Sequence, residues 1–326
     1  MPTIRAWDER WPIAGAFATA HGSKTEAHVV VAEISDGDRR GRGECTPYPR
    51  YGETAEGVLA DIARVAVVLE GGADRGTLQS LIGPGAARNA LDCALWDLEA
   101  KRTGVPASSA AGVMTMHPVK TAYTISVADP ADMAESARAA ARRPMLKLKM
   151  AGPDGVDGII AVRRAAPRTR LIVDANESLT LDDLVRLSPV LRALDIRLME
   201  QPLKAGEDAG LEGYSGPIPL CADESLHTRA ELDACAGRYA CINIKLDKTG
   251  GLTEALALAH DARARGLQIM IGSMVATSLA MAPAMILAQG ADFVDLDGPL
   301  LLERDRKPSL SVIGSMLEPP RPELWG

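Results

Sequence analysis

Residues 170–202, RLIVDANESLTLDDLVRLSPVLRALDIRLMEQP, contain one complete repeat of the pattern that decides the fold. An apolar run at 170–176 predicts a buried strand, the stretch after it is typical of a helix, and a second apolar run covers 197–202. A strand, a helix and another strand in this order predict a parallel βαβ unit.

The same pattern recurs eight times from about residue 121. The intervals leave room for one strand, one helix and two loops in each repeat. Eight such repeats predict an α/β fold with a closed parallel barrel. The expected strands are Thr121–Val127, Met145–Met150, Arg170–Asn176, Arg197–Pro202, Pro219–Ser225, Cys241–Lys248, Gln268–Met274 and Phe293–Leu300.

The residues before the barrel predict a separate α+β domain. His28–Ile34 is a β-branched run followed by turn residues, which is typical of a hairpin arm, and Ala86–Arg102 has apolar residues at helical spacing. We therefore expect an α+β capping domain over residues 1–115, a barrel over 116–302, and a tail at about 303–326 that completes the capping domain.

Composition excludes several classes of protein. The formal net charge of −7 disfavours a nucleic-acid partner, because phosphate binding needs a basic surface. No run approaches the length of about 18 apolar residues that a membrane span needs, and the N-terminus lacks a signal-peptide pattern. The five cysteines show no metal or disulfide spacing and are interpreted as free thiols. We expect a cytoplasmic protein without a membrane segment.

Charged residues stand at the carboxyl ends of strands that should be buried on both faces. Lys147 and Lys149 end the second strand, and Asp295 and Asp297 end the eighth. Because side chains alternate along a strand, each of these pairs shares one face. Active sites of parallel barrels are built from these strand ends, so the pattern predicts an active site.

Three carboxylates at successive strand ends predict a metal site. Asp174, Glu200 and Asp223 follow strands three, four and five, whose ends converge at the barrel mouth. Oxygen ligands without His or Cys favour Mg²⁺ over zinc, and Mn²⁺ could substitute.

Two lysines would flank this metal from opposite sides of the barrel. Lys149 belongs to strand two and Lys245 to strand six, which suggests one base on each face of a substrate. A lysine acts as a base only when its pKa is lowered, and Lys147 together with the metal would lower it. Lys147 could also donate to the oxygen of a developing enolate.

Each residue has a simpler interpretation when taken alone. A Lys-x-Lys pair is typical of a solvated strand edge, Asp174 and Asp223 could cap helices, and the stem of Lys245 could cover apolar surface. Their order, one at each strand end, favours the active-site interpretation. The five histidines form no ligand pattern and receive no role.

The runs LKLK at 146–149, VDAN at 173–176, MEQP at 199–202, ADES at 222–225 and NIK at 243–245 resemble the muconate-lactonizing subgroup of the enolase superfamily. The finer resemblance, over nearly the whole chain, is to L-Ala-D/L-Glu epimerases. It implies a (β/α)7β modified TIM barrel with an α+β N-terminal capping domain, and an isomerase that epimerises dipeptides in cell-wall (murein) peptide recycling. The implied reaction is a proton transfer between two lysines through a metal-stabilised enolate.

The resemblance also implies a role for each site residue. Lys149 and Lys245 are the acid/base pair, and Mg²⁺ is held by the three carboxylates. Asp295 and Asp297 bind the α-ammonium group of the dipeptide, and a loop at about 17–24 closes over it. Other implied substrate contacts come from Lys24, Thr124 and Ser273.

Two residues depart from the pattern of the resembled family, and two other functions remain as alternatives. Lys24 stands where relatives often carry Arg, and Ala276 stands where they show Glu or Cys, so the preferred side chain is open. A cycloisomerase or lyase of the same superfamily would share the metal and lysines but offers no ammonium group to Asp295 and Asp297. A metal-stabilised binding protein would need no opposed lysines. A homo-oligomer is possible.

Overall fold

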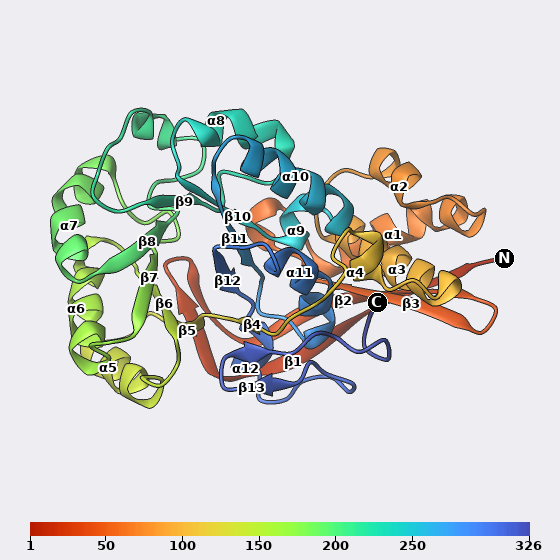
Figure 1. Ribbon diagram of the computed structural model, residues 1–326, viewed down its shortest axis with the longest axis horizontal. Helices are drawn as coiled ribbons and strands as arrows, with labels where there is room; N and C mark the ends of the chain where they lie inside the picture. The colour runs from red at the N-terminus through yellow and green to blue at the C-terminus, as the bar shows by residue number, and fades with distance from the viewer.

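The computed structural model describes residues 1–326 and contains a parallel barrel and an N-terminal α+β part. Figure 1 shows the barrel strands in yellow-green to blue, with the red N-terminal strands running beside them. The predicted fold class is confirmed.

Eight parallel strands form the barrel in the order β12-β11-β10-β9-β8-β7-β6-β5. The first and last strands approach each other where the Ala122 N–H donates to the Val294 carbonyl at 2.8 Å, so the barrel is nearly closed. The strands are β5 (Tyr123–Ile125), β6 (Met145–Lys149), β7 (Arg170–Asp174), β8 (Ile196–Glu200), β9 (Leu220–Ala222), β10 (Cys241–Ile244), β11 (Gln268–Gly272) and β12 (Phe293–Asp295).

Several strands are shorter than predicted. The chain turns into short helices, α9 (Leu246–Thr249) and α12 (Gly298–Leu301), where the sequence suggested that strands six and eight continue. Asp247, inside the range expected for strand six, therefore lies in α9 and not in a strand.

An apolar layer fills the barrel below the site. Each strand, or the residue just before it, contributes one buried side chain to this layer. The next inward positions, two residues further along, are polar on every strand except β11, where Gly272 stands, so the period of two separates an apolar base from a charged mouth. The layer consists of Ala122, Met145, Ile172, Leu198, Cys221, Cys241, Met270 and Phe293.

Helices cover the outside of the barrel, and one repeat lacks a full helix. Between β8 and β9 the chain forms only the 3-10 turn η3 (Asp208–Leu211). The remaining elements of the barrel are α5 (Pro130–Ala139), η2 (Pro153–Gly155), α6 (Val156–Ala165), α7 (Leu181–Ala193), η4 (Arg229–Glu231), α8 (Leu232–Ala236), α10 (Leu252–Ala264) and α11 (Ser278–Ala288).

The N-terminal part is a three-stranded antiparallel sheet with helices packed on it. The predicted hairpin arm lies in β2, and the predicted helix is α3, which ends at Gly104 with a left-handed φ of 72°. The elements are β1 (Thr3–Thr19), β2 (Gly22–Asp36), β3 (Arg39–Cys45), η1 (Pro49–Tyr51), α1 (Ala55–Glu70), α2 (Arg75–Leu81), α3 (Ala86–Thr103) and α4 (Ala107–Ala110).

The segment expected as a loop at 17–24 is the tip of the β1–β2 hairpin. Phe17 pairs with Lys24 and Thr19 with Gly22. The tip reaches the barrel near β5 and β6 (Figure 1), where the Val127 N–H donates to the Ala18 carbonyl at 3.0 Å. The sheet itself therefore delivers these residues to the barrel mouth.

The C-terminal segment returns to α3. The Trp325 indole N–H donates to the Cys93 carbonyl at 3.0 Å, and the Gly326 N–H donates to Asp97 at 2.8 Å. These contacts support the proposed completion of the capping domain by the tail. Part of the tail, β13 (Val312–Ile313) and β14 (Met316–Leu317), instead pairs with β4 (Val119–Lys120) at the start of the barrel.

All five cysteines are free and buried, as expected. None of the helices combines the length and the apolar character that crossing a membrane requires.

Candidate active site

A cavity of about 570 Å³ lies between the barrel mouth and the hairpin tip. Both parts of the chain line it: Lys147, Lys149 and Lys245 come from the barrel, while Lys24 comes from the hairpin. Eight of the expected catalytic and substrate-binding residues, together with one expected metal ligand, line this one cavity. They are Lys24, Thr124, Lys147, Lys149, Asp223, Lys245, Ser273, Asp295 and Asp297.

The other two expected ligands, Asp174 and Glu200, are buried beside this cavity and contact its lysines. Lys149 Nζ lies 2.6 Å from Asp174 Oδ2, and Lys147 Nζ lies 3.1 Å from the same oxygen and 2.7 Å from Glu200 Oε2. On the other side Lys245 Nζ lies 2.6 Å from Asp223 Oδ2. The structure therefore brings the three carboxylates and three lysines of the prediction into one network.

The carboxylates respond differently to this burial. Burial opposes ionisation of Asp174, but Lys149 and Lys147 outweigh it and lower its pKa to about 2. Burial likewise opposes ionisation of Asp223, and Lys245 and Lys248 hold its pKa well below the usual range. Burial and the neighbouring charge of Asp174 raise the pKa of Glu200 to about 7. The positive charge of the lysines therefore offsets burial at Asp174 and Asp223, but it does not offset burial and repulsion at Glu200.

These residues fit a hard divalent cation. All three donors are buried carboxylates, and the contact of Glu200 Oε2 is the ion pair with Lys147 Nζ at 2.7 Å. The lysine ammonium groups contact all three carboxylates. A divalent cation among these carboxylates would relieve the repulsion at Glu200.

The contacts of Lys245 and Lys147 with carboxylates dominate their pKa values. Burial lowers the pKa of Lys245, but Asp223 and Glu200 outweigh it and leave the pKa well above its usual value. The same balance raises the pKa of Lys147, with Asp295 as the strongest partner. The expected lowering depends on a bound metal ion beside the lysines and stays a prediction.

Asp295 and Asp297 face the cavity together, as the strand period predicted. Lys147 Nζ donates to Asp295 Oδ2 at 2.7 Å, while Asp295 Oδ1 is buried without a hydrogen bond. Asp297 Oδ2 accepts from the Thr124 N–H at 2.6 Å. Burial and the charge of Asp295 raise the pKa of Asp297 to about 7. This pair lacks a full complement of positive charge.

Lys24 brings a third ammonium group toward Lys149 and Lys245. Burial and the charges of these two lysines lower the pKa of Lys24 to about 8. Lys24 Nζ also lies 5.6 Å from the centre of the Phe17 ring, as does Lys149 Nζ. The cavity therefore offers an anion a cluster of lysines, and offers a cation the Asp295–Asp297 pair.

Sequence reasoning missed two buried residues of the network. Lys248 Nζ donates to Asp223 Oδ1 at 2.6 Å and to the Asn243 carbonyl at 2.9 Å, and Asn243 Nδ2 donates to Glu200 Oε1 at 2.8 Å. Asn243 lies two residues before Lys245, so the strand period could have found it. Lys248 lies in α9, where that period gives no guide.

Asp247 lies close to the site but serves the contact between the domains. Its Oδ1 accepts from the Thr46 N–H at 3.0 Å and from Asn89 Nδ2 at 2.8 Å, so it joins the barrel to the capping domain. Burial raises its pKa to about 7.

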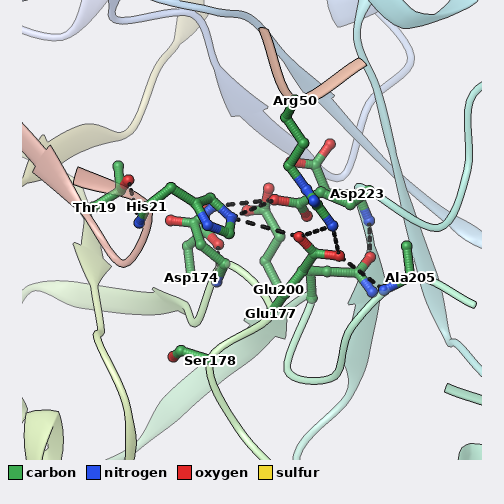
Figure 2. Close-up of polar contacts among 12 residues, drawn as sticks. Thr19, His21, Arg50, Asp174, Glu177, Ser178, Glu200, Ala205 and Asp223 are labelled. Atoms are coloured by element: carbon green, nitrogen blue, oxygen red, sulfur yellow. Dashed lines mark hydrogen bonds and ion pairs between the residues drawn. The ribbon is translucent and has the colours of Figure 1, made fainter. Parts of the chain in front are cut away.

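A second polar cluster lies beside the cavity, and Figure 2 shows His21 and Arg50 directed at Glu177. His21, Glu177 and Glu224 place one potential ligand atom each within 4.8 Å of one another. Asp174, Glu200 and Asp223 do not place their oxygens this close together. His21 received no role from the sequence.

Comparison with known proteins identifies both parts of the chain. Residues 1–112 match the mandelate racemase / muconate lactonizing enzyme N-terminal domain, and residues 131–312 match the enolase C-terminal domain-like family. The L-Ala-D/L-Glu epimerase of Escherichia coli K12 is 46% identical over 312 residues, covering 95% of this chain and 97% of that protein. The N-acetyl-D-glutamate racemase of a Pseudoalteromonas species is 42% identical, with 91% and 95% covered.

Solved structures agree with this assignment. An enolase family member from Agrobacterium tumefaciens, with homology to dipeptide epimerases and with sodium and L-Ala-L-Glu bound, superimposes with a TM-score of 0.99 at 50% identity over 100% of both chains. A dipeptide epimerase from Enterococcus faecalis, complexed with Mg and L-Leu-L-Tyr, gives a TM-score of 0.90 at 26% identity over 98% of this chain and 96% of that one. With both domains matched and close relatives along nearly its full length, this chain belongs to the mandelate racemase / muconate lactonizing enzyme family of the enolase superfamily.

Proposed function

We propose that this chain is a Mg²⁺-dependent dipeptide epimerase, and that L-Ala-D/L-Glu is its preferred pair of substrates. The observation that carries the proposal is the arrangement of charge in the cavity. Lys149 and Lys245 come from β6 and β10, four strands apart in a sheet of eight, so they approach a substrate from opposite sides. The carboxylate pair of Asp295 and Asp297 lines the same cavity and suits an amino group.

Asp174, Glu200 and Asp223 would hold Mg²⁺, and Mn²⁺ may substitute for it in this all-carboxylate site. When bound, the ion supplies positive charge beside the substrate carboxylate, which makes the neighbouring α-proton more acidic. The burial of all three carboxylates at neighbouring strand ends supports this assignment. The Enterococcus faecalis relative with bound Mg supports it as well.

Lys149 and Lys245 perform the proton transfer. One neutral lysine removes the α-proton of the C-terminal residue, and the other, as an ammonium, delivers a proton to the opposite face of that carbon. Burial opposes the charged form of Lys245, whereas the contact with Asp223 stabilises that charged form. When Asp223 is engaged elsewhere, the pKa of Lys245 falls toward the range that a general base needs. Lys147 points a further N–H donor into the cavity, where it can stabilise negative charge on the substrate.

Substrate recognition divides between the two ends of the dipeptide. Asp295 and Asp297 bind the N-terminal ammonium group. Its positive charge offsets the repulsion between these two buried carboxylates. Lys24 binds the side-chain carboxylate of glutamate, and the lysines around it favour an anion there. Thr124 and Ser273 contact the substrate from β5 and the end of β11.

Glutamate next to L-alanine is the chemistry of cell-wall peptides, so we place this activity in the recycling of murein peptides in the cytoplasm. The named activity of the Escherichia coli relative supports the substrate.

A second candidate function is racemisation of an N-acylated glutamate. The Pseudoalteromonas relative, an N-acetyl-D-glutamate racemase at 42% identity, favours it. Such a substrate retains the glutamate but lacks the ammonium group. Asp295 and Asp297 would then be left as a buried pair without a cation partner, which favours the dipeptide.

A substrate screen in D₂O tests the proposal. The Mg²⁺-loaded enzyme is incubated with a dipeptide library, N-acetylglutamate and superfamily lyase substrates, and mass spectrometry measures deuterium at the α-carbon. We expect the fastest exchange with L-Ala-L-Glu and L-Ala-D-Glu. Exchange with N-acetylglutamate alone would establish the second function, and absence of exchange from every substrate would indicate a binding protein.

A further inference from the structure

Glu177 is a buried carboxylate beside the cavity, next to the lining residue Asn176, and the proposed reaction does not use it. Its side chain is 2% exposed. The barrel fixes it from two directions, because its N–H donates to the Gln201 carbonyl at 2.8 Å and its Oε1 accepts from the Ala205 N–H at 2.8 Å. Glu177 is therefore a rigid feature of the barrel.

An arginine and a histidine of the capping domain meet on this carboxylate (Figure 2). The Arg50 guanidinium, in η1, forms an ion pair with it. His21, at the tip of the β1–β2 hairpin, places Nε2 3.5 Å from Glu177 Oε2 and 4.0 Å from Glu224 Oε1. Glu177 lies within ion-pairing distance of both capping segments, whereas Glu224 reaches that distance only to His21.

The backbone at Glu177 is strained. Asn176 has a φ of 42° and Glu177 a φ of 66°. Asn tolerates this left-handed region, but a Glu there costs on the order of 1–3 kcal/mol. The chain retains a conformation that is unfavourable for stability, and it directs the carboxylate toward the capping domain. Strain of this kind clusters at functional sites.

The two segments that reach Glu177 also line the cavity. The hairpin that carries His21 carries Lys24, and the turn that carries Arg50 carries Tyr51. We propose that Glu177 is a positioning residue: through His21 and Arg50 it holds both capping segments over the cavity and so sets the place of Lys24 and Tyr51 around the substrate.

The cluster is better explained as a latch than as a second metal site. Its three potential ligand atoms lie close enough together for a metal, but Glu177 already has a permanently charged partner in Arg50. The latch is also a weak contributor to overall stability, because Arg50 is 38% and His21 35% exposed. A substitution of Glu177 should therefore loosen the two capping segments over the cavity while it changes the free energy of unfolding only slightly.

The test begins with Glu177→Gln, which keeps the size of the side chain and an oxygen for the Ala205 N–H but removes the charge. The inference rests on the proposed epimerase activity for its kinetic readout. We expect the KM for L-Ala-L-Glu to rise about tenfold while kcat changes less than about threefold, a shift typical of two weak ion pairs. Glu212→Gln, an exposed carboxylate without an ion pair, is the matched control and should behave like the parent.

Coupling between variants separates a latch from a general structural defect. Arg50→Gln should raise KM in the parent but add little in the Glu177→Gln background, because both changes break the same contact. Arg50→Lys should retain part of the affinity. Additive effects of Arg50→Gln and Glu177→Gln would overturn the proposal. If Glu177→Gln folds poorly, a parental KM in Arg50→Gln alone would overturn it.

Hydrogen exchange gives a readout that needs no substrate. Amides of residues 17–24 should exchange faster in Glu177→Gln than in the parent or in Glu212→Gln, with unchanged protection of the barrel strands. This result would stand even if the enzyme acts on another substrate. Parental protection of the tip in Glu177→Gln would refute the latch.

Discussion

Removing only the ammonium group from the substrate tests the role of Asp295 and Asp297. N-propionyl-L-glutamate has the shape of L-Ala-L-Glu but carries a hydrogen where the dipeptide carries its ammonium group. If the carboxylate pair binds that group, the propionyl compound should be a much poorer substrate. N-acetylated L-Ala-L-Glu, which loses the charge and gains bulk, should be poorer as well.

The structure gives a scale for this loss. Burial and the charge of Asp295 raise the pKa of Asp297 to about 7, so this buried pair disfavours a second negative charge and favours a cation partner. A charge-assisted hydrogen bond to an ammonium group typically returns about 1.5–3 kcal/mol. We therefore expect kcat/KM to fall by about tenfold to about 150-fold.

The assay compares kcat/KM for the two compounds by deuterium incorporation at the glutamate α-carbon, in the parent and in Asp297→Asn. Asp297 is the better position to change, because Asp295 contacts Lys147 and its loss would disturb a second group. In Asp297→Asn the ratio of kcat/KM between the dipeptide and the propionyl compound should fall. The reason is that activity toward the dipeptide is lost, while activity toward the propionyl compound persists. Equal kcat/KM for both compounds in the parent would refute the reasoning and favour the N-acylglutamate function.

Three further predictions concern the metal and the lysines. Chelation of divalent cations should abolish turnover, and Mg²⁺ or Mn²⁺ should restore it; full activity of metal-free enzyme, measured after dialysis against chelator, would contradict the metal assignment. Replacing Lys149 or Lys245 by Ala should stop interconversion of the epimers by at least about 10³-fold, while one-sided α-proton exchange can persist; parental epimerisation by either variant, followed by polarimetry, would exclude two bases. Since the lowered pKa of Lys24 is about 8, its ammonium form is present below that pH and lost above it, so the KM for L-Ala-L-Glu should rise above about pH 8; Lys24→Arg should remove this rise, and its persistence there would assign the titration to another group.

The sequence by itself determined the barrel and most of its site. Apolar strands that alternate with helices bury their side chains in a parallel sheet covered by helices. With eight such repeats the sheet forms a barrel, and the carboxyl ends of its strands meet at one mouth. Residues at those ends, such as Lys149, Asp223 and Asp295, were therefore predictable without knowing the curvature of the sheet or the path of any loop. Their grouping around one cavity is the direct consequence of parallel strands.

Only the tertiary structure decided which charges meet between the domains. Arg50 and Glu177 are separated by 127 positions, and no periodicity of strand or helix relates a hairpin tip or turn to a barrel loop. The pKa values depended on the same information: neighbouring lysines suggested a lowered pKa, whereas the carboxylate contact of Lys245 raises it. Electrostatic energies depend on burial and on distances of a few ångströms, which local sequence patterns do not contain and which the packing of one domain on the other determines.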